Sequence, residues 1–523
     1  GQMSPLPFKL VRKLNFFYIY HKFSIEKAYK FTMNKNLKLF NSLSKEKEVF
    51  YTNKKGNVSM YVCGPTVYNL LHIGNFRGPI FFNLVRNWLE HLKYKVKYVY
   101  NYTDIDDKII DKAKIEKLDA KIISQKYIVE FEKDYASLKI PKPSFTPKCT
   151  DYIDDIIIFI SELIDNHFAY YNNGHVFFSI KKFDNYGKLS RKNVDDLLVG
   201  HRVKINDNKK NPLDFVLWKP SNGDNPGWES PWGYGRPGWH IECSAMSSKL
   251  LGSNIDIHGG GIDLLFPHHE NEIAQSESRF KTSFSNFWVH NNLINFDNQK
   301  MSKSLGNIIK ARDFIADYNS EILKILILSV HYRSVLNFNE SLINNSITNL
   351  IKIYSSINLA DSIIVKQKNQ KENLDFKNFV HRCEEKICEF MNNDFNTPGF
   401  FSIIFDSIRR FNLLAVNKKI TPELKYISLS FLSFIKKYGK ILGLFNENSS
   451  EFLSELSLLL LKNKNISITH LEELINKRNK ARKEKNYKLS DEIRNEIFEL
   501  GIEIKDEPDG LTKWSVKVDF KKN

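Results

Sequence analysis

Residues 58–107 read VSMYVCGPTVYNLLHIGNFRGPIFFNLVRNWLEHLKYKVKYVYNYTDIDD, and three elements are predicted in this segment. Residues 58–62 form a short apolar run typical of a strand. Apolar residues from 74 to 92 then recur at helical spacing, and residues 96–102 again have the pattern of a strand. Strand, loop, helix and strand in this order form a βαβ unit, so the segment predicts a parallel sheet of the kind that binds nucleotides.

The same sheet is predicted to resume much later in the chain. Residues 254–261, NIDIHGGG, have the form of a further strand and loop. Between the two halves, residues 118–225 contain turns of their own, such as Asn172-Asn173-Gly174, which predicts a mixed insertion. Beyond about residue 320 glycine is scarce and apolar residues keep helical spacing, which predicts a helical bundle. Residues 501–518 alternate as strands do.

These patterns predict an α/β chain with several domains. Its 523 residues are too many for one hydrophobic core. We expect a Rossmann-like parallel-sheet catalytic domain with a mixed insertion, followed by a C-terminal helical bundle and a small terminal module. The expected boundaries are 1–33 for a poorly ordered extension, 34–117 and 226–299 for the two halves of the catalytic domain, 118–225 for the insertion, 300–345 for the KMSKS loop and stem-contact region, 346–490 for the bundle and 491–523 for the terminal module.

The amino-acid composition indicates which kinds of binding partner and which compartment to expect. The formal net charge is +17, from 77 basic and 60 acidic residues. This charge favours nucleic acid as a partner, although a general bias toward Lys and Asn explains it equally well. No apolar run is long enough to cross a membrane, so no membrane partner is expected. Five scattered cysteines do not form a disulfide framework, which indicates a reducing compartment.

Two motifs have the chemistry of phosphate binding, and the first is His72-Ile73-Gly74-Asn75 at the predicted helix start. Gly74 permits a close approach of the backbone to a ligand. The helix N-terminus offers unpaired N–H groups and a partial positive charge. His72 and Asn75 add side-chain donors. A capping loop has the same residue types, so the motif alone does not separate the two explanations.

The second motif is Lys300-Met301-Ser302-Lys303-Ser304. Lys300 and Lys303 are three residues apart, and together with the hydroxyl of Ser302 they can neutralise a triphosphate. Lysines placed in this way stabilise the charge that develops on departing pyrophosphate. The alternative is a solvated basic loop.

A third group of residues has the chemistry of a metal site. Cys63 follows the first predicted strand, and Cys243 lies in GRPGWHIEC at 235–243. His268 and Glu272 are four residues apart, so they share one face of a helix and can bind one ion. Two thiolates, an imidazole and a carboxylate are a plausible zinc set. His269 is an alternative ligand, because its spacing from Glu272 also fits.

The two phosphate motifs resemble the HIGH and KMSKS signatures of class I aminoacyl-tRNA synthetases. Asn75 replaces the last His of the first signature, which keeps a hydrogen-bond donor but cannot become cationic. Over about residues 37–514 the chain resembles cysteinyl-tRNA synthetases, and five segments carry this resemblance: 61–68, 101–108, 211–219, 235–246 and 256–275.

The resemblance implies the roles of specific residues. It implies one zinc ion per chain, with the thiolate of the substrate as an added ligand, on Cys63, Cys243, His268 and Glu272. It implies a cysteine pocket lined by Thr66, Thr103, Trp239 and His258. The ATP phosphates would be served by His72, Asn75, Lys300 and Lys303, with Gly74 and Ser302 beside them. The nucleoside would be held by Gly259, Gly260 and Asp263.

The implied reaction activates L-cysteine with Mg²⁺-ATP and loads it onto tRNA-Cys. The implied protein is a monomer in the cytoplasm, or in an organelle if residues 1–33 act as a transit segment: that segment has six basic residues and one acidic residue. Two rivals are an enzyme that joins cysteine to an amino-sugar and a non-catalytic tRNA-binding or zinc-dependent regulatory protein. The long C-terminal region argues against the first, and the intact motifs argue against the second.

The C-terminal region also contains sequence features without an assigned role. Residues 394–398, DFNTP, resemble the same family. Residues 477–488 include seven basic residues in twelve, which predicts either a solvated helix face or a contact with tRNA phosphates.

Overall fold

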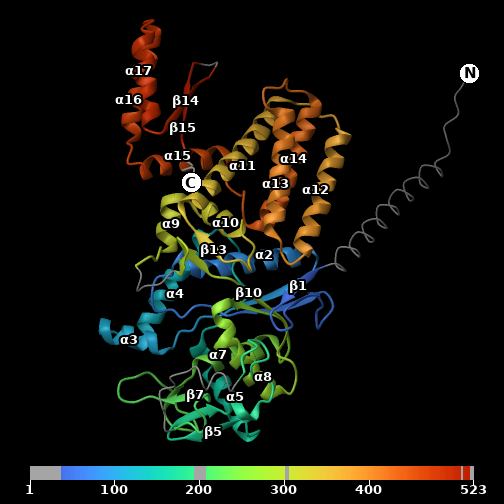
Figure 1. The fold of residues 1–523 in the computed structure, drawn as a ribbon, viewed down its shortest axis with the longest axis vertical. Helices are drawn as coiled ribbons and strands as arrows, with labels where there is room; N and C mark the ends of the chain where they lie inside the picture. Colours follow the sequence, from blue (N-terminus) through green and yellow to red (C-terminus); the bar gives the residue numbers. More distant parts are fainter. Residues whose placement is uncertain (1–36, 194–207, 301–305, 508–509, 519–523) are drawn as a thin grey trace, which may run out of the picture.

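The fold is taken from a computed structural model, which describes residues 37–193, 208–300, 306–507 and 510–518. The expected extension at 1–33 lies outside the described residues. Figure 1 shows the catalytic part in the lower half of the molecule, with the helical bundle and the terminal module above it. No helix among the described residues is long and apolar enough to span a membrane.

A four-stranded parallel sheet forms the centre of the catalytic domain. The strand order is β10-β9-β3-β4, and every neighbouring pair is parallel. The strands are β3 (Asn57–Val62), β4 (Lys95–Tyr100), β9 (Ile255–Gly261) and β10 (Ser285–Asn291). The predicted βαβ unit and the resumption of the sheet after the insertion are therefore confirmed.

The helix of the βαβ unit connects the sheet to the C-terminal bundle. A 3₁₀ turn, η1 (Ile73–Phe76), leads into α2 (Arg77–His91). The apolar face of α2 packs on the sheet, and Trp88 is fully buried. The indole N–H of Trp88 donates to Asn392 Oδ1 at 3.0 Å. In Figure 1 α2 lies above the sheet, and α7 (Trp239–Leu251) and α8 (Glu270–Phe280) lie below it.

The insertion is built around an antiparallel sheet of order β5-β6-β7-β8. Its elements are α5 (Ile153–Asp165), β5 (Ala169–Asn172), β6 (His175–Phe178), β7 (Phe215–Pro220) and β8 (Gly235–Pro237). Asn173 and Gly174 form the β5–β6 turn with φ of 49° and 78°, as the predicted turn requires. Because β8 belongs to this sheet, the expected boundary at 225 falls inside it.

The expected start of the insertion at 118 also includes a helix that packs on the catalytic core. After α3 (Asp107–Glu116), α4 (Ala120–Ser137) places Phe131 in a stack with Phe76 and Tyr100. Phe131 is buried. The helical spacing of the buried residues in α4 predicts a buried face. The sequence did not indicate that this face packs on the catalytic core, because its partners Phe76 and Tyr100 lie far away in the chain.

A small mixed sheet and two helices join the catalytic domain to the bundle. They are β11 (Ile294–Phe296), β12 (Gln299–Lys300), β13 (Leu336–Phe338), α9 (Ala311–Tyr318) and α10 (Ser320–Leu328). The bundle consists of α11 (Glu340–Lys366), α12 (Leu374–Asn392), α13 (Thr397–Ala415) and α14 (Pro422–Leu442). The expected boundary at 346 therefore falls inside α11.

The terminal module is larger than predicted. It follows α15 (Ser449–Asn463) and contains α16 (Ile468–Lys483), α17 (Tyr487–Glu499), β14 (Ile502–Asp506) and β15 (Thr512–Val516). The two strands pair antiparallel, in agreement with the predicted alternation. The expected boundary at 491 cuts α17.

The DFNTP motif ties the bundle to the catalytic domain. Asp394 is fully buried and accepts hydrogen bonds from Phe40 N in β1 (Lys38–Asn41) at 2.9 Å and from Arg333 Nε at 2.7 Å. The Tyr332 hydroxyl donates to the same carboxylate. β1 pairs with β2 (Glu46–Val49) at the edge of the catalytic domain. The motif thus has a structural role that its sequence alone did not reveal.

Candidate active site and metal centre

The candidate site lies where the parallel strands end at their carboxyl edge. Cys63 follows β3, Thr103 follows β4, and His258 lies within β9. Cys243 comes from α7, which starts tightly against the insertion sheet: a Cβ on Gly238 would lie 2.1 Å from the Val216 carbonyl oxygen. The carboxyl edge of a parallel sheet is the usual place for a ligand site in this architecture.

The four predicted metal ligands lie together. The ligand atoms of Cys63, Cys243, His268 and Glu272 are all within 4.8 Å of one another, and all four residues are buried. The two sulfurs are 3.6 Å apart, and Cys63 Sγ is 3.3 Å from Glu272 Oε1. His268 Nε2 is 3.1 Å from the same carboxylate oxygen. Both cysteines are free thiols.

This cluster fits a zinc ion by the chemistry of its donors. Two sulfurs, an imidazole nitrogen and a carboxylate oxygen form a recognised zinc donor set. His268 Nδ1 lies 3.0 Å from His240 Nδ1, so a second residue orients the ring and leaves Nε2 toward the cluster.

The mutual contacts shift the pKa values within the cluster. Burial raises the pKa of the Cys243 thiol, but hydrogen bonds with Cys63 and His268 outweigh burial and lower the pKa to about 6. For Cys63, burial and the hydrogen bond with Cys243 both raise the pKa. Burial raises the pKa of Glu272, but His258 and His268 lower it to about 2. Burial lowers the pKa of His268, but hydrogen bonds with Cys243 and Glu272 outweigh burial and raise it to about 10. Without a metal, the cluster therefore favours an ionised Cys243 and Glu272 around a protonated His268, and a bound metal ion would replace that proton.

His269, the alternative ligand, belongs to a second possible group with Cys63, His258 and Glu272. In that group His269 Nε2 is 4.0 Å from Glu272 Oε1, and its Nδ1 is 2.7 Å from His290 Nε2. This second group has one sulfur rather than two. The group that includes Cys243 is therefore the better zinc site.

The residues expected in the cysteine pocket surround this cluster. Thr66 and Thr103 form a parallel backbone bridge. The ring centroids of Trp239 and His268 are 4.5 Å apart. His258 Nε2 lies 2.8 Å from Glu272 Oε2. The structure thus places Trp239 and His258 against residues of the cluster, and Thr66 beside Thr103 at the carboxyl edge of the sheet.

Sequence reasoning missed Glu242, which precedes Cys243 in α7. Its carboxylate is buried, and Oε2 accepts a hydrogen bond from the Thr103 hydroxyl at 2.9 Å. Burial, followed by the neighbouring Cys243, raises the pKa of Glu242 well above its usual range. The only sequence signal was its position next to the predicted metal ligand Cys243, at helical spacing from Trp239.

The first phosphate motif pairs through its backbone with residues 309–311, which follow the second motif in the chain. His72 N donates to Asn75 Oδ1 at 3.0 Å, so Asn75 caps the η1 turn. Ile73 N donates to the Ile309 carbonyl at 3.0 Å, and Ala311 N donates to the Leu71 carbonyl. The chain just after the KMSKS segment therefore runs beside the first motif. Lys300 ends β12, whereas Ser302 and Lys303 lie outside the described residues.

The glycines of β9 are explained in part by packing. A Cβ on Gly259 would lie 2.4 Å from Phe82 Cζ of α2, and one on Gly260 would lie 3.0 Å from the His269 ring. Asp263 follows in the turn η4 (Ile262–Leu264) and is exposed. Their predicted roles toward the nucleoside remain predictions.

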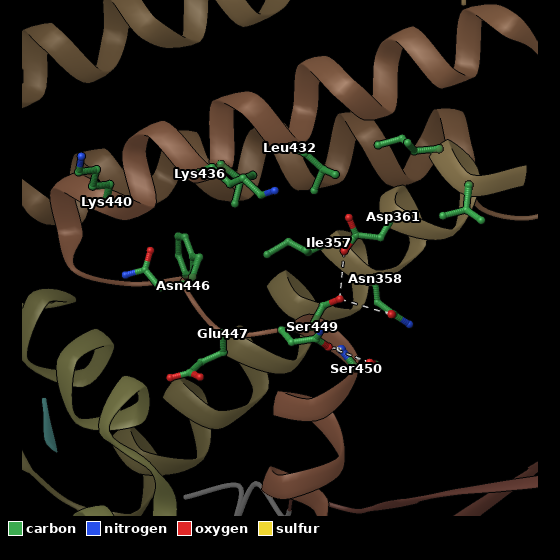
Figure 2. A pocket seen from close by; sticks show the side chains of 15 residues that line it. Ile357, Asn358, Asp361, Leu432, Lys436, Lys440, Asn446, Glu447, Ser449 and Ser450 are labelled. Carbon is green, nitrogen blue, oxygen red and sulfur yellow. Dashed lines mark hydrogen bonds between the residues drawn. The ribbon is translucent and has the colours of Figure 1, made fainter. Parts of the chain in front are cut away.

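A separate cavity of about 840 Å³ lies in the helical region. Figure 2 shows it between α11, α14 and the loop that leads into α15. Lys436 and Lys440 project from α14, and the Ser449 hydroxyl bonds to Asp361 Oδ2 at 3.2 Å. None of the predicted site residues lines this cavity. The cavity therefore lies at the contact between the bundle and the terminal helices and is not part of the candidate site.

Comparisons with known proteins agree with this architecture. A family model described as "tRNA synthetases class I (C) catalytic domain" matches residues 49–348, and one described as "DALR domain" matches residues 386–446. A protein of Bdellovibrio bacteriovorus named "Cysteine--tRNA ligase" is 46% identical over 481 residues, which are 92% of this chain and 99% of that protein.

Two solved structures of Mycobacterium tuberculosis methionyl-tRNA synthetase, each with methionyl-adenylate, share the fold. One is 11% identical over 77% of this chain and 94% of its own, with a TM-score of 0.59. The other is 11% identical over 76% and 93%, with a TM-score of 0.58. These two likenesses concern the fold alone, whereas the matched catalytic domain and the 46% identical relative identify the family. The chain therefore belongs to the class I tRNA synthetases, in the cysteine–tRNA ligase family.

Proposed function

We propose that this protein is a cysteine–tRNA ligase that joins L-cysteine to the 3′-terminal ribose of tRNA-Cys at the expense of ATP. The observation that carries the proposal is the buried cluster of Cys63, Cys243, His268 and Glu272 at the carboxyl edge of the sheet. A nucleotide-binding fold with a thiol-rich metal centre at its ligand edge suits an enzyme that must select a thiol and activate a carboxylate.

The four residues of the cluster would hold one zinc ion per chain. A bound zinc ion would favour a thiolate sulfur over a serine hydroxyl. A pocket based on shape alone discriminates poorly between such similar side chains. Thr66, Thr103, Trp239 and His258 would line the rest of the pocket and orient the amino acid.

Activation requires no enzymic nucleophile. The carboxylate of cysteine attacks the α-phosphorus of Mg²⁺-ATP, which gives cysteinyl-adenylate and pyrophosphate. The residues that serve the phosphates in this proposal are His72, Gly74, Asn75, Lys300, Ser302 and Lys303. The backbone pairing of Ile73 with Ile309 supports a shared site for the two motifs. Catalysis then consists of orientation and stabilisation of the developing charge, with the nucleoside at Gly259, Gly260 and Asp263.

The C-terminal helices would bind the tRNA. On α16 and the turn that follows it, Lys477, Lys480, Lys483 and Lys485 are exposed. Arg478 is different: its guanidinium is buried and makes two hydrogen bonds to Asp506, at 2.9 and 2.8 Å. The lysines are therefore the residues of this run that would contact RNA phosphates.

The proposal also covers the oligomeric state of the enzyme and its cellular compartment. We propose that the enzyme is a monomer. A reducing compartment, in the first place the cytoplasm, would keep Cys63 and Cys243 as thiols, because their sulfurs are only 3.6 Å apart. The interior of an organelle would serve equally, if residues 1–33 act as a transit segment.

The test combines metal analysis with two assays on the purified full chain. We expect about one zinc per chain, cysteine-dependent pyrophosphate exchange that serine does not support, and charging of tRNA-Cys. Exchange without charging of tRNA would instead favour an amino-sugar ligase. Absence of both activities in a zinc-loaded, folded protein would favour a non-catalytic role and refute the proposal.

A further inference from the structure

Arg77 is a buried cation at the start of α2, close behind the first phosphate motif. It is the first residue of the helix and is only 1% exposed. Burial lowers the pKa of its guanidinium to about 10, so the group stays charged near neutral pH. A buried charge is costly unless hydrogen bonds compensate it. Among the described residues, the hydrogen-bond partners of this guanidinium are four backbone carbonyl oxygens.

The four carbonyls belong to two segments that are far apart in the chain. Nη1 of Arg77 donates to the carbonyl of Asn292 at 3.0 Å and to that of Leu293 at 2.7 Å. Nη2 donates to the carbonyl of His331 at 3.1 Å and to that of Ser334 at 2.6 Å. A guanidinium holds its N–H groups in one rigid plane, so these bonds fix the two segments relative to each other and to α2.

Both segments lead into the small sheet that holds the start of the second phosphate motif. Leu293 directly precedes β11, and Ser334 lies two residues before β13. β11 and β13 pair parallel. β12 pairs antiparallel with β11 and ends at Lys300, the first residue of the second motif. Arg77 therefore connects the start of α2 to the hairpin that ends at Lys300.

We propose that Arg77 is a positioning residue for adenylate formation, because it fixes the hairpin of β11 and β12 relative to the first phosphate motif. The inference rests on the proposed function, in which both motifs serve the phosphates of one ATP. The backbone pairing of Ile73 with Ile309 holds the chain after the second motif, and Arg77 holds the chain before it. A displacement of about 1 Å between groups that act on one reacting centre can slow a reaction about 100-fold.

Arg86 offers a matched comparison in the same helix. It is 6% exposed, and its guanidinium donates to the carbonyls of Pro141 at 2.7 Å and Lys142 at 2.6 Å. These acceptors lie in the segment that follows α4. Both arginines thus make buried guanidinium–carbonyl bonds. Of the two, only Arg77 bonds, within the described part of the chain, to the segments that lead to the second motif.

The experiment compares Arg77→Met with Arg86→Met in the zinc-loaded full chain. It measures the single-turnover rate of adenylate formation, the dissociation constant of L-cysteine, the zinc content and the thermal stability. Arg77→Met should slow adenylate formation about tenfold or more, while the dissociation constant of L-cysteine changes by less than about twofold and zinc is retained. Arg86→Met should lower the stability to a similar extent but slow adenylate formation by less than about twofold.

A conservative variant separates position from charge. Arg77→Lys keeps the positive charge but offers one nitrogen in place of the planar fork. It cannot hold both segments in the same geometry, so adenylate formation should remain slowed by about fivefold or more. Full recovery of the rate in Arg77→Lys would show that charge alone is required and would overturn the positioning role. Arg77→Lys also decides the question if Arg77→Met fails to fold or loses zinc.

The outcomes separate this inference from the proposed function. Equal slowing by Arg77→Met and Arg86→Met, or a normal rate in Arg77→Met, overturns the role of Arg77 while the function stands. A loss of cysteine affinity as large as the loss of rate also overturns it, because the effect would then not be specific to the phosphate motifs. An unmodified enzyme without cysteine-dependent pyrophosphate exchange would refute the proposed function, and this inference would fall with it.

Discussion

The substitution Gly259→Ala tests whether this glycine serves packing or the nucleotide. A Cβ at this position would lie 2.4 Å from Phe82 Cζ and 2.5 Å from Phe82 Cε1. Phe82 is fully buried in α2, so its ring has little room to move. Overpacking of this kind costs about 1–3 kcal/mol, and we expect Gly259→Ala to destabilise the protein by that amount.

A second substitution makes the cause specific. Phe82→Leu alone should cost about 1–2 kcal/mol as a large-to-small change. In combination with Gly259→Ala it should cost at least about 1 kcal/mol less than the sum, because the smaller side chain makes room for the methyl group. Gly78→Ala in the same helix is the control: its Cβ would have only Asn291 Oδ1 at 3.4 Å, so it should be neutral or stabilising.

The assay is unfolding followed by circular dichroism, together with the KM for ATP in pyrophosphate exchange. If packing alone requires this glycine, stability should fall, Phe82→Leu should partly restore it, and the KM for ATP should not change, which would remove Gly259 from the proposed nucleoside site. Additive costs of the two substitutions, or normal stability with a clearly raised KM for ATP, would refute the packing argument and assign Gly259 to the nucleotide.

Four other variants test the site, the tRNA surface and the pH dependence. Cys243→Ser should lose zinc and cysteine activation together; a metal-free variant that still prefers cysteine over serine would contradict the proposed selection. Lys303→Ala should slow adenylate formation by about 100-fold or more and leave cysteine binding unchanged; the reverse pattern would remove Lys303 from the phosphate site. Lys480→Glu combined with Lys483→Glu should raise the KM for tRNA and flatten its salt dependence, while pyrophosphate exchange stays normal; an unchanged KM would exclude this surface. Burial, with the charges of nearby lysines, lowers the pKa of His91 to about 4, so below about pH 6.5 the unfolded chain takes up a proton that the folded chain does not. Stability should therefore fall by roughly 2–3 kcal/mol between about pH 6.5 and 4, and His91→Leu should flatten that part of the stability profile; an identical profile would show that other groups control it.

The central sheet could be predicted from the sequence because its signals are local. The apolar run before Cys63 and the helical spacing up to Leu92 need no distant partner to be recognised. The pairing of His268 with Glu272 was equally local, since four residues span one helical turn. The grouping of His268 and Glu272 with Cys63 and Cys243 could not be predicted from spacing, because Cys63 and Glu272 are 209 positions apart in the chain. That grouping came from the resemblance to a family.

The features that the sequence did not reveal depend on contacts between distant segments. β8 follows a long loop and three residues give no strand pattern, so its place in the insertion sheet could not be predicted. Phe131 reads as an ordinary apolar residue of α4, and only the stacks with Phe76 and Tyr100 assign it to the catalytic core. Glu242 has the same limitation, because its burial and its hydrogen bond with the Thr103 hydroxyl arise only when distant segments fold together.

The basic run at 477–488 shows why counting charges does not identify a binding surface. From the sequence, the seven positive charges predicted either a solvated helix face or a contact with tRNA phosphates. In the structure, Arg478 and Arg482 both form ion pairs with Asp506 at the end of β14. Hydrogen bonds from Arg478 and Thr512 lower the pKa of Asp506, so the carboxylate stays ionised and holds the arginines. These ion pairs join α16 to the terminal hairpin. The exposed lysines Lys477, Lys480, Lys483 and Lys485 remain available for a polyanion. The two arginines of the run thus stabilise the fold and the lysines are the candidates for contact with tRNA, so replacing the lysines should change the salt dependence of tRNA binding.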